Sequence, residues 1–324
     1  MTAVLDRTPE VATDASVTER PAASWLSRAG AFALDVLLGL AVIAAMALLT
    51  LSAPQRGWLW WVLTGAAVAV FVLIAVNRLL LPSMIGWSLG RALFGIAVRR
   101  PDGAPVGLFR LVARDVAHLL DTAAVFVGWL WPLWDRRNRT FADLLLRTEV
   151  QKVDAPQRDM RRPVAVALIA ATLLCAAGVG LSYLAVYRPA RAVEVARAQI
   201  ADQGPRIVEK LLSYDVNTLQ QDFANAQSLT TDAYKPQLID QQQAVQKAGA
   251  TKNTYYAVSS AVLSATPDKA SMLVALQGQR GADPATLKFI TATLRVDFEK
   301  SRDGQWRVSN LTVLKKPQLG PGAP

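Results

Sequence analysis

Three long apolar runs lie in the first part of the chain, before residue 188, and no comparable run follows them. They cover residues 28–49, 57–76 and 163–187, and the second and third contain no charged residue. A helix of about 20 apolar residues spans the roughly 30 Å of hydrocarbon in a bilayer. The pattern therefore predicts an α-helical membrane region that crosses the bilayer at these three places.

A shorter apolar stretch, residues 122–134, lies between the second and third runs. Its 13 uncharged residues are too few for a full span, and Pro132 interrupts them. Arginines stand on both sides, so a single crossing would place one basic group on the outer side. These features favour a re-entrant or in-plane helix. A full span is the alternative, and it would reverse the side on which the C-terminal part lies.

The pattern changes after residue 188. Apolar residues recur with helical spacing through residues 191–215, 216–229 and 231–249. Segments rich in Val, Tyr, Phe and Thr follow, at residues 253–265, 269–279, 287–301 and 304–314. The last two are joined by Arg302-Asp303-Gly304, a hairpin signal. Helices followed by consecutive strands predict an α+β soluble domain, with helices on a four-stranded antiparallel sheet.

The net charge of +10 is divided evenly along the chain. Residues 1–187 hold 18 basic and 13 acidic residues, and residues 188–324 hold 17 and 12, so each part carries +5. In the first part the basic residues flank the apolar runs, where they set topology and meet anionic lipid. This distribution predicts a multi-pass plasma-membrane protein with no nucleic-acid partner, a cytoplasmic N-terminus and an extracytoplasmic C-terminal domain.

Few residues suited to catalysis are present. The chain has one histidine and one cysteine, and it lacks the common phosphate-loop, dinucleotide, zinc-peptidase and nucleophile-elbow motifs. We therefore expect a protein that is not an enzyme and that uses no metal or cofactor. Arg114, His118 and Asp121 share one helical face. A hydrogen-bonded face at the cytoplasmic surface is favoured over a proton or ion relay.

Asp35 is an unusual residue because it lies inside the first apolar run. A charged side chain near the centre of a membrane helix costs at least about 2.5 kcal/mol, so it needs a partner or a task. Arg28 is on the same face but about 10 Å away along the helix axis. We expect a donor from another segment, with Arg91 and Arg139 as candidates. A structural ion pair is favoured over ion carriage.

Three stretches of the first part resemble the RDD membrane domain, over about residues 22–152. They are RAGAFALD, the long segment that begins GWSLGRALFGIAVRR, and RNRTFADLLLRTEV. On this resemblance Arg28, Asp35 and Asp143 occupy the positions that give the family its name. Leu89 and Arg91 replace the usual proline and lysine of the central motif. The family-motif residues of this part are Arg28, Asp35, Asp143, Gly86, Gly90 and Arg91.

The remainder, from about residue 160 to 315, resembles the Mce-associated membrane proteins. The matching stretches are LLSYDVNTLQQDFANAQSLTTDAYKPQ and DGQWRVSNLTVL, with Tyr214, Asp215, Asp222 and Trp306 as motif residues. The resemblance implies an NTF2-like or VirB8-like cone of helices wrapped on a curved antiparallel sheet. It also implies partners, namely Mce complex subunits or other Mce-associated proteins, together with membrane lipid. Trp306, Phe298 and Tyr256 are expected in the core of the cone.

These observations predict five segments. They are a disordered cytoplasmic tail (1–22), an RDD-like membrane domain (23–152), a basic linker with a transmembrane helix (153–187), an extracytoplasmic α+β domain (188–315) and a disordered tail (316–324). The expected function is that of a non-catalytic accessory protein that assembles or stabilises an Mce-type lipid or sterol import complex. The alternatives are an ion or proton antiporter that uses Asp35, Asp143 and neighbouring arginines, and a lipid-binding module in the cone.

Overall fold

The computed structural model describes residues 21–154, 159–281 and 287–319 of the chain. Contacts divide the chain into two compact units, Met1–Ser182 and Tyr183–Pro324. The tail predicted as disordered over residues 1–22 lies outside the described residues, apart from Pro21 and Ala22.

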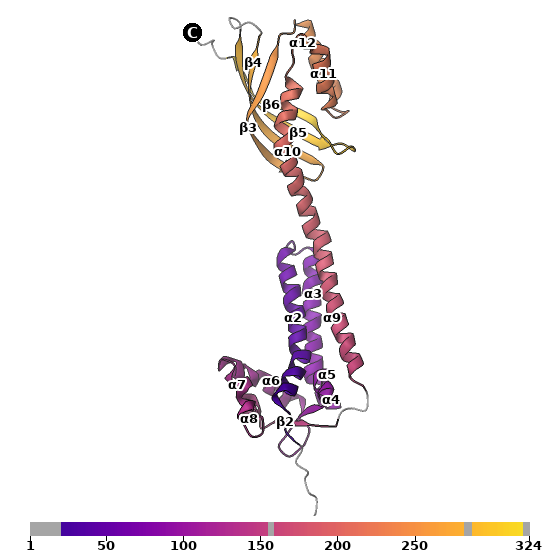
Figure 1. Cartoon of the computed structure of the whole chain (residues 1–324), viewed down its shortest axis with the longest axis vertical. Coiled ribbons are helices and arrows are strands. Elements are labelled where there is room, and N and C mark those ends of the chain that lie inside the picture. The colour runs from indigo at the N-terminus through magenta and orange to yellow at the C-terminus, as the bar shows by residue number, and fades with distance from the viewer. Residues whose placement is uncertain (1–20, 155–158, 282–286, 320–324) are drawn as a thin grey trace, which may run out of the picture. The chain divides into compact units, whose positions relative to one another are not determined.

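The described part of the first unit is mainly helical (Figure 1). Its elements, in chain order, are α1 (Trp25–Phe32), η1 (Ala33–Leu37), α2 (Leu38–Ser52), α3 (Trp58–Ala75), η2 (Val76–Leu80), α4 (Leu81–Ile85), α5 (Leu89–Leu93), β1 (Ile96–Arg99), α6 (Leu108–Ala123), α7 (Val127–Leu130), η3 (Trp131–Leu133), α8 (Phe141–Leu146), β2 (Glu149–Lys152) and α9 (Arg161–Ser182).

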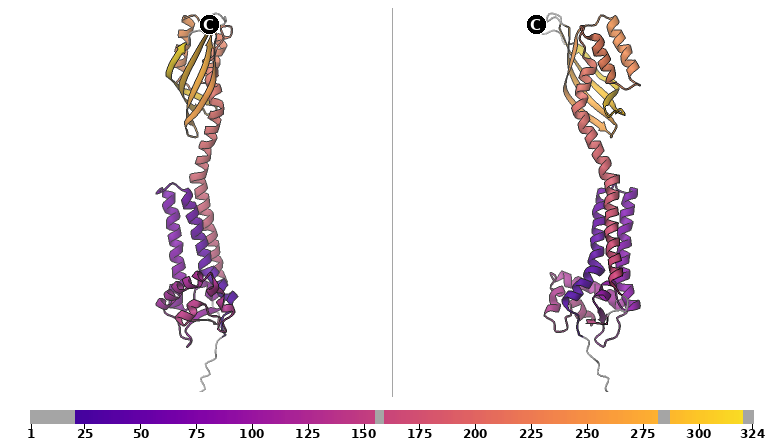
Figure 2. Two further views of the ribbon diagram at one scale, coloured as in Figure 1. Left: turned by 90° about the vertical axis from the view of Figure 1, so that its left-hand side faces the viewer. Right: turned by 45° about the vertical axis from the view of Figure 1, so that its right-hand side comes forward.

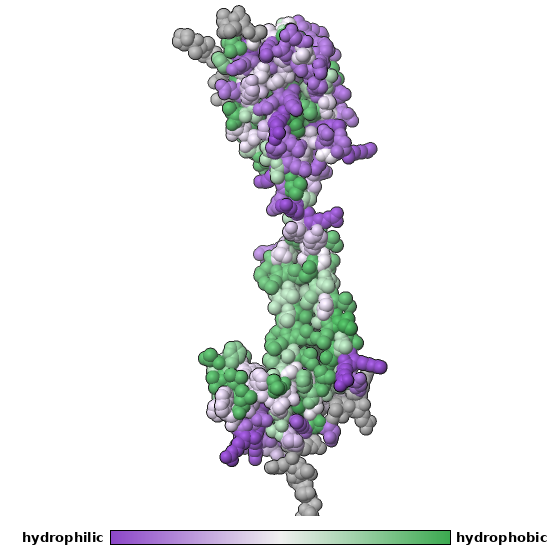
Figure 3. Space-filling view, viewed as in Figure 1, coloured by the Kyte–Doolittle hydropathy of each residue, from purple (hydrophilic) through white to green (hydrophobic). Residues whose placement is uncertain are grey.

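Three helical stretches of the described chain are long and apolar enough to cross a membrane: Trp25–Ser52, Trp58–Ile85 and Arg161–Leu212. Their most apolar windows have mean hydropathies of 2.5, 2.4 and 2.5. Figure 3 shows a continuous hydrophobic surface over α2 and α3. Large apolar side chains such as Leu51 and Phe71 are exposed there, as expected where lipid replaces water. This confirms the multi-pass membrane region.

The helices α2, α3 and α9 pack as a bundle (Figure 2). Gly178 of α9 lies against Met46 of α2, where an added Cβ would come 3.0 Å from the Met46 Cε atom. The small residue allows the two helices to approach closely, a common device between membrane helices.

The segment from α6 to η3 is bent rather than straight. The axes of Leu108–Ala123 and Val127–Leu133 differ by 109°, the geometry of a broken span or a re-entrant loop. Arg114, His118 and Asp121 share one face of α6, as predicted. That face is buried within the domain, and its expected place at the cytoplasmic surface stays a prediction. The outward side of α6 is apolar instead, with Phe109, Val116 and Leu119 exposed.

A short antiparallel pair of strands joins the segment before α6 to the segment after α8. Strand β1 pairs with β2 from Ile96 opposite Lys152 to Arg99 opposite Glu149. Ala22 forms a further bridge to Gln151, and the Ala23 N–H donates to the Val150 carbonyl at 2.8 Å. Residues near the start of α1 are thereby held beside the segment that follows α8.

The second unit is an α+β domain, which confirms the predicted fold class. Its elements are η4 (Tyr183–Tyr187), α10 (Arg188–Leu212), α11 (Leu219–Ser228), α12 (Lys235–Lys247), β3 (Asn253–Ala265), β4 (Lys269–Arg280), β5 (Lys288–Lys300) and β6 (Trp306–Leu319). The strands form one antiparallel sheet in the order β3-β4-β5-β6. The helices lie over one face of this curved sheet (Figure 2).

The core of the second unit lies between α10 and the sheet. Ile200 and Val208 of α10 pack with Val296 and Phe298 of β5 in one buried cluster. Trp306 is buried in the same cluster, as predicted. The expectation for Tyr256 is wrong, because this side chain is 56% exposed.

The predicted hairpin and the predicted C-terminal tail have different outcomes. The Arg302-Asp303-Gly304 turn joins β5 to β6, and Lys300 pairs with Trp306 across it. The disordered tail predicted over residues 316–324 is wrong for its first part, since β6 continues to Leu319, opposite Ile290 of β5. Residues 320–324 lie outside the described residues.

Candidate functional site

Two arginines share one buried carboxylate within the first unit. Asp143 of α8 has 0% exposure. Arg28 of α1 donates to its Oδ2 atom, and Arg114 of α6 donates to its Oδ1 atom at 2.7 Å. The Thr148 hydroxyl donates to Oδ1 at 2.9 Å, and the Thr140 N–H donates to Oδ2 at 3.2 Å. One carboxylate thereby connects three helices that are distant in the sequence.

Local structure and charge together fix Asp143 in its ionised form. Thr140 is the N-cap of α8, and its hydroxyl accepts from the Asp143 N–H in a capping box. Burial opposes ionisation, but the positive charges of Arg114 and Arg28 and their hydrogen bonds outweigh it. They hold the pKa of Asp143 below its usual range. Asp143 is therefore a permanent counter-charge for two buried guanidinium groups.

Asp35 is held by neutral donors. It lies in the π-helical turn η1 and is 2% exposed. Its Oδ1 atom accepts from the Asn77 side-chain amide at 2.7 Å and from the Gly90 N–H at 2.8 Å, and its Oδ2 atom accepts from the Ser88 hydroxyl. Asn77 Oδ1 also accepts from the Leu89 N–H at 3.0 Å. Asp35 and Asn77 thus satisfy the first free N–H groups of α5.

The expected ion pair of Asp35 with Arg91 or Arg139 is wrong. Arg139 instead makes a bidentate pair with Asp135, four residues earlier, with both hydrogen bonds at 3.0 Å. Hydrogen bonds from the Arg139 side chain lower the pKa of Asp135 to about 2. Arg91 donates no hydrogen bond to Asp35.

Two glycines of the predicted motif have clear structural causes. Gly86 ends α4 in the left-handed conformation, with φ of 89°. Gly90 lies so close to α1 that an added Cβ would come 2.4 Å from the Ala31 carbonyl oxygen and 2.9 Å from Asp35 Oδ1. Any larger residue at position 90 would push α5 away from Asp35.

Further charged contacts lie near this site, and the ion pair of Arg78 was not anticipated from the sequence. Arg78 makes a bidentate pair with Asp115, with both hydrogen bonds at 3.0 Å. His118 hydrogen-bonds Asp121 at 2.5 Å and stacks on Trp129 with a centroid distance of 4.5 Å. A signal for Arg78 was present, since a polar Asn-Arg pair directly follows the second apolar run.

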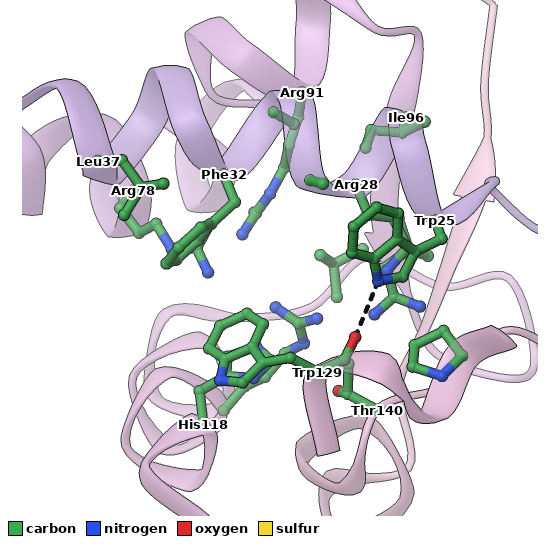
Figure 4. Close-up of a pocket in the computed structure, with 16 residues that line it drawn as sticks. Trp25, Arg28, Phe32, Leu37, Arg78, Arg91, Ile96, His118, Trp129 and Thr140 are labelled. Atoms are coloured by element: carbon green, nitrogen blue, oxygen red, sulfur yellow. Dashed lines mark hydrogen bonds between the residues drawn. The ribbon is translucent and has the colours of Figure 1, made fainter. Parts of the chain in front are cut away.

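A cavity of about 210 Å³ lies among these groups. Figure 4 shows Arg91 projecting into it, opposite His118 and Trp129. Arg91 is 4% exposed and has no ion pair or side-chain hydrogen bond within the part of the chain that the structure describes. Burial, with the positive charges of Arg78 and Arg114, lowers the pKa of Arg91 to about 9.

The motif residues of the second unit have structural positions. Asp222 accepts from the Asp215 N–H at 3.0 Å and from the Thr218 hydroxyl at 2.7 Å, which closes the turn between α10 and α11. Tyr214 pairs with Asn253 through two backbone hydrogen bonds. Backbone N–H groups and Lys252 lower the pKa of Asp215. Trp306 lies elsewhere, in the core. These residues thus lie at two places in the domain.

The first part of the chain matches a known family over residues 22–147. Those residues form an RDD family domain. The proline-rich antigen homolog of Mycobacterium tuberculosis is 38% identical over 65 residues, which are 20% of this chain and 27% of that protein. The proline-rich antigen of Mycobacterium leprae is 34% identical over 64 residues, which are 19% of this chain and 26% of that protein. The chain thus spans about a quarter of the length of these relatives.

A longer match joins the chain to another mycobacterial protein. The uncharacterized protein Rv1362c of Mycobacterium tuberculosis is 34% identical over 160 residues, covering 47% of this chain and 72% of that protein. A match of this extent places the two in one family. Among solved structures, the chain is similar to an IcmL-like type IV secretion system protein of Legionella pneumophila, at a TM-score of 0.32 and 14% identity. The match covers 39% of this chain and 96% of that protein. It is also similar to CagV, a VirB8 homolog of Helicobacter pylori, at a TM-score of 0.30 and 9% identity. That match covers 36% of this chain and 96% of CagV.

Replacing Asp143 by Asn should destabilise the RDD domain strongly. The change leaves Arg28 and Arg114 buried without a counter-charge, and breaking such a pair costs about 3–5 kcal/mol. The midpoint of thermal unfolding of the detergent-purified full chain measures this loss. Because the pKa of Asp143 is lowered, its contribution is fully present above pH about 4 and is lost only as the pH falls further. Asp102→Asn, at an exposed turn, is the control and should unfold like the wild type.

Gly90→Ala should reduce the amount of folded protein, because its Cβ would meet the Ala31 carbonyl and Asp35. Gly65→Ala is the matched control, since a Cβ at position 65 meets nothing within 4 Å. Folded yield after size-exclusion chromatography compares the two variants. Equal yields would contradict the close approach of α5 to α1.

Proposed function

We propose that this RDD protein is a non-catalytic membrane accessory protein that assembles or stabilises an Mce-type lipid or sterol import complex. In this proposal the RDD domain anchors the chain in the plasma membrane. The N-terminus is cytoplasmic, and the α+β domain after residue 188 docks on partner subunits outside the cytoplasm. The basic residues beside the apolar runs support this orientation.

One observation carries the anchoring role: both name-giving aspartates of the RDD domain are held by several hydrogen-bond partners within the domain. Asp143 joins α1, α6 and α8, while Asp35 holds the start of α5. Each carboxylate has no more than 2% of its surface exposed. Side chains used in this way fix the packing of helices and are poorly placed to exchange ions with solvent.

Support for the Mce partner comes from the motif of the second unit. The connection from α10 to α11 is shaped by Tyr214, Asp215 and Asp222. Trp306 lies in the core of the domain. Their roles are structural, so the motif marks a domain built to one pattern rather than a reaction centre. A domain of this kind, held at a membrane by a helical anchor, suits docking.

Co-purification from native membranes tests the docking role. We expect tagged full-length protein, extracted in mild detergent, to recover Mce subunits, and a variant that ends after residue 187 to lose them. Membrane yield of the shortened variant is the control for an intact anchor. Absence of Mce subunits from the full-length sample, with other known complexes recovered, would contradict the proposal.

Asp35→Asn separates this role from ion or proton antiport. An amide keeps the shape of Asp35 and can still accept from Asn77 and Gly90 while donating to the Ser88 hydroxyl. We expect normal abundance and normal partner recovery for Asp35→Asn, and loss of both for Asp35→Leu. An antiporter would instead lose ion flux in vesicles on Asp35→Asn at unchanged abundance.

A further inference from the structure

The cavity of the RDD domain has cationic polar groups and no acidic side chain along its described wall. Four arginines and one histidine contribute to the wall, and the remaining lining residues are apolar or neutral. The charged lining residues are Arg28, Arg78, Arg91, Arg114 and His118. The carboxylates that pair with this group, Asp115, Asp121 and Asp143, are not among the residues that line the cavity. An anion in the cavity would therefore meet hydrogen-bond donors.

Arg91 differs from the other three arginines. Arg28 and Arg114 donate to Asp143, and Arg78 donates to Asp115. The Arg91 guanidinium is buried and points into the cavity, with no partner among the described side chains (Figure 4). A buried unpaired charge is costly. The planar guanidinium fork fits the oxygens of a phosphate or carboxylate through two parallel hydrogen bonds.

Asp35 does not cancel this charge by direct contact. Of the carboxylates that favour the charged form of Arg91 through space, Asp35 has the largest effect. Both of its oxygens instead accept hydrogen bonds from the neutral donors Asn77, Ser88 and Gly90. The donors of Arg91 therefore remain directed at the cavity.

An apolar groove adjoins the cavity. It shares Phe32, Arg78, His118 and Trp129 with the cavity wall. Asp115, which is paired with Arg78, also lines the groove, and the remaining lining residues are mainly apolar, among them Phe71, Ile74 and Leu119. Phe71 and Leu119 are more than half exposed, on the apolar surface of the domain. A ligand with an anionic head and a hydrocarbon tail would match the cavity and the groove together.

We propose that the RDD cavity binds the phosphate of an anionic phospholipid, with Arg91 as the principal donor and the acyl chain along the groove lined by Phe71, Ile74 and Leu119. This site is separate from the proposed docking role of the second unit. Bound lipid would supply the counter-charge that Arg91 lacks.

Binding to the detergent-purified full chain tests the proposal. The probes are dioctanoyl phosphatidic acid, inorganic phosphate and dioctanoyl glycerol, followed by isothermal calorimetry and by the shift in thermal unfolding midpoint. We expect the phosphatidic acid to bind at least about tenfold more tightly than inorganic phosphate, and the neutral glycerolipid to give no shift. Equal binding of phosphate and phosphatidic acid would overturn the lipid assignment.

Arg91→Gln should weaken phosphatidic acid binding about tenfold or more, as for the loss of one charge-assisted hydrogen-bonding group. Arg110→Gln on α6 is the matched control, because Arg110 is exposed and its replacement removes the same charge. Arg91→Lys keeps the charge but loses the fork, so it should fall between the two and serves if Arg91→Gln fails to fold. Wild-type affinity in both Arg91 variants would overturn the proposal.

Discussion

The packing of the RDD domain depends on one buried carboxylate. Asp143 receives Arg28 from 115 residues away and Arg114 from 29 residues away, and it ties α1 and α6 to α8. In a medium of low dielectric constant the attraction between such groups is strong, but an unpaired member is very costly. The three side chains therefore have to be brought together as a unit. This requirement fixes where the bent segment after α6 can lie, and with it the wall of the cavity.

The same requirement explains the reversed polarity of α6. Its buried side presents Arg114, His118 and Asp121, while Phe109 and Leu119 face outward. A soluble amphipathic helix buries its apolar side because water drives that side inward. Here the exposed side of α6 is apolar, like that of the membrane helices, so the polar groups gain more from each other than from the surroundings. Mutual pairing satisfies most of them.

Sequence patterns predicted the elements better than the contacts between them. Long apolar runs and alternating strands predicted the membrane helices and the four-stranded sheet, and the Arg302-Asp303-Gly304 signal predicted a hairpin. Periodicity gives the face on which a residue lies, not the helix that it meets, so the neutral donors to Asp35 were missed. For Arg139, the nearby Asp135 competes successfully with any distant carboxylate. Tyr256 was misjudged because β3 is an edge strand with a register shift after Ala257.

The short helix α5 separates two groups that would otherwise neutralise each other. Gly90 and Arg91 are adjacent, yet the Gly90 N–H donates to Asp35 while the Arg91 side chain enters the cavity. Because a glycine at position 90 lets the backbone itself approach Asp35, the carboxylate is satisfied without using the arginine. A direct ion pair between Asp35 and Arg91 would have neutralised both charges and left the cavity with no unpaired donor. Holding Asp35 with neutral groups is therefore what leaves Arg91 available to an anion from outside the chain.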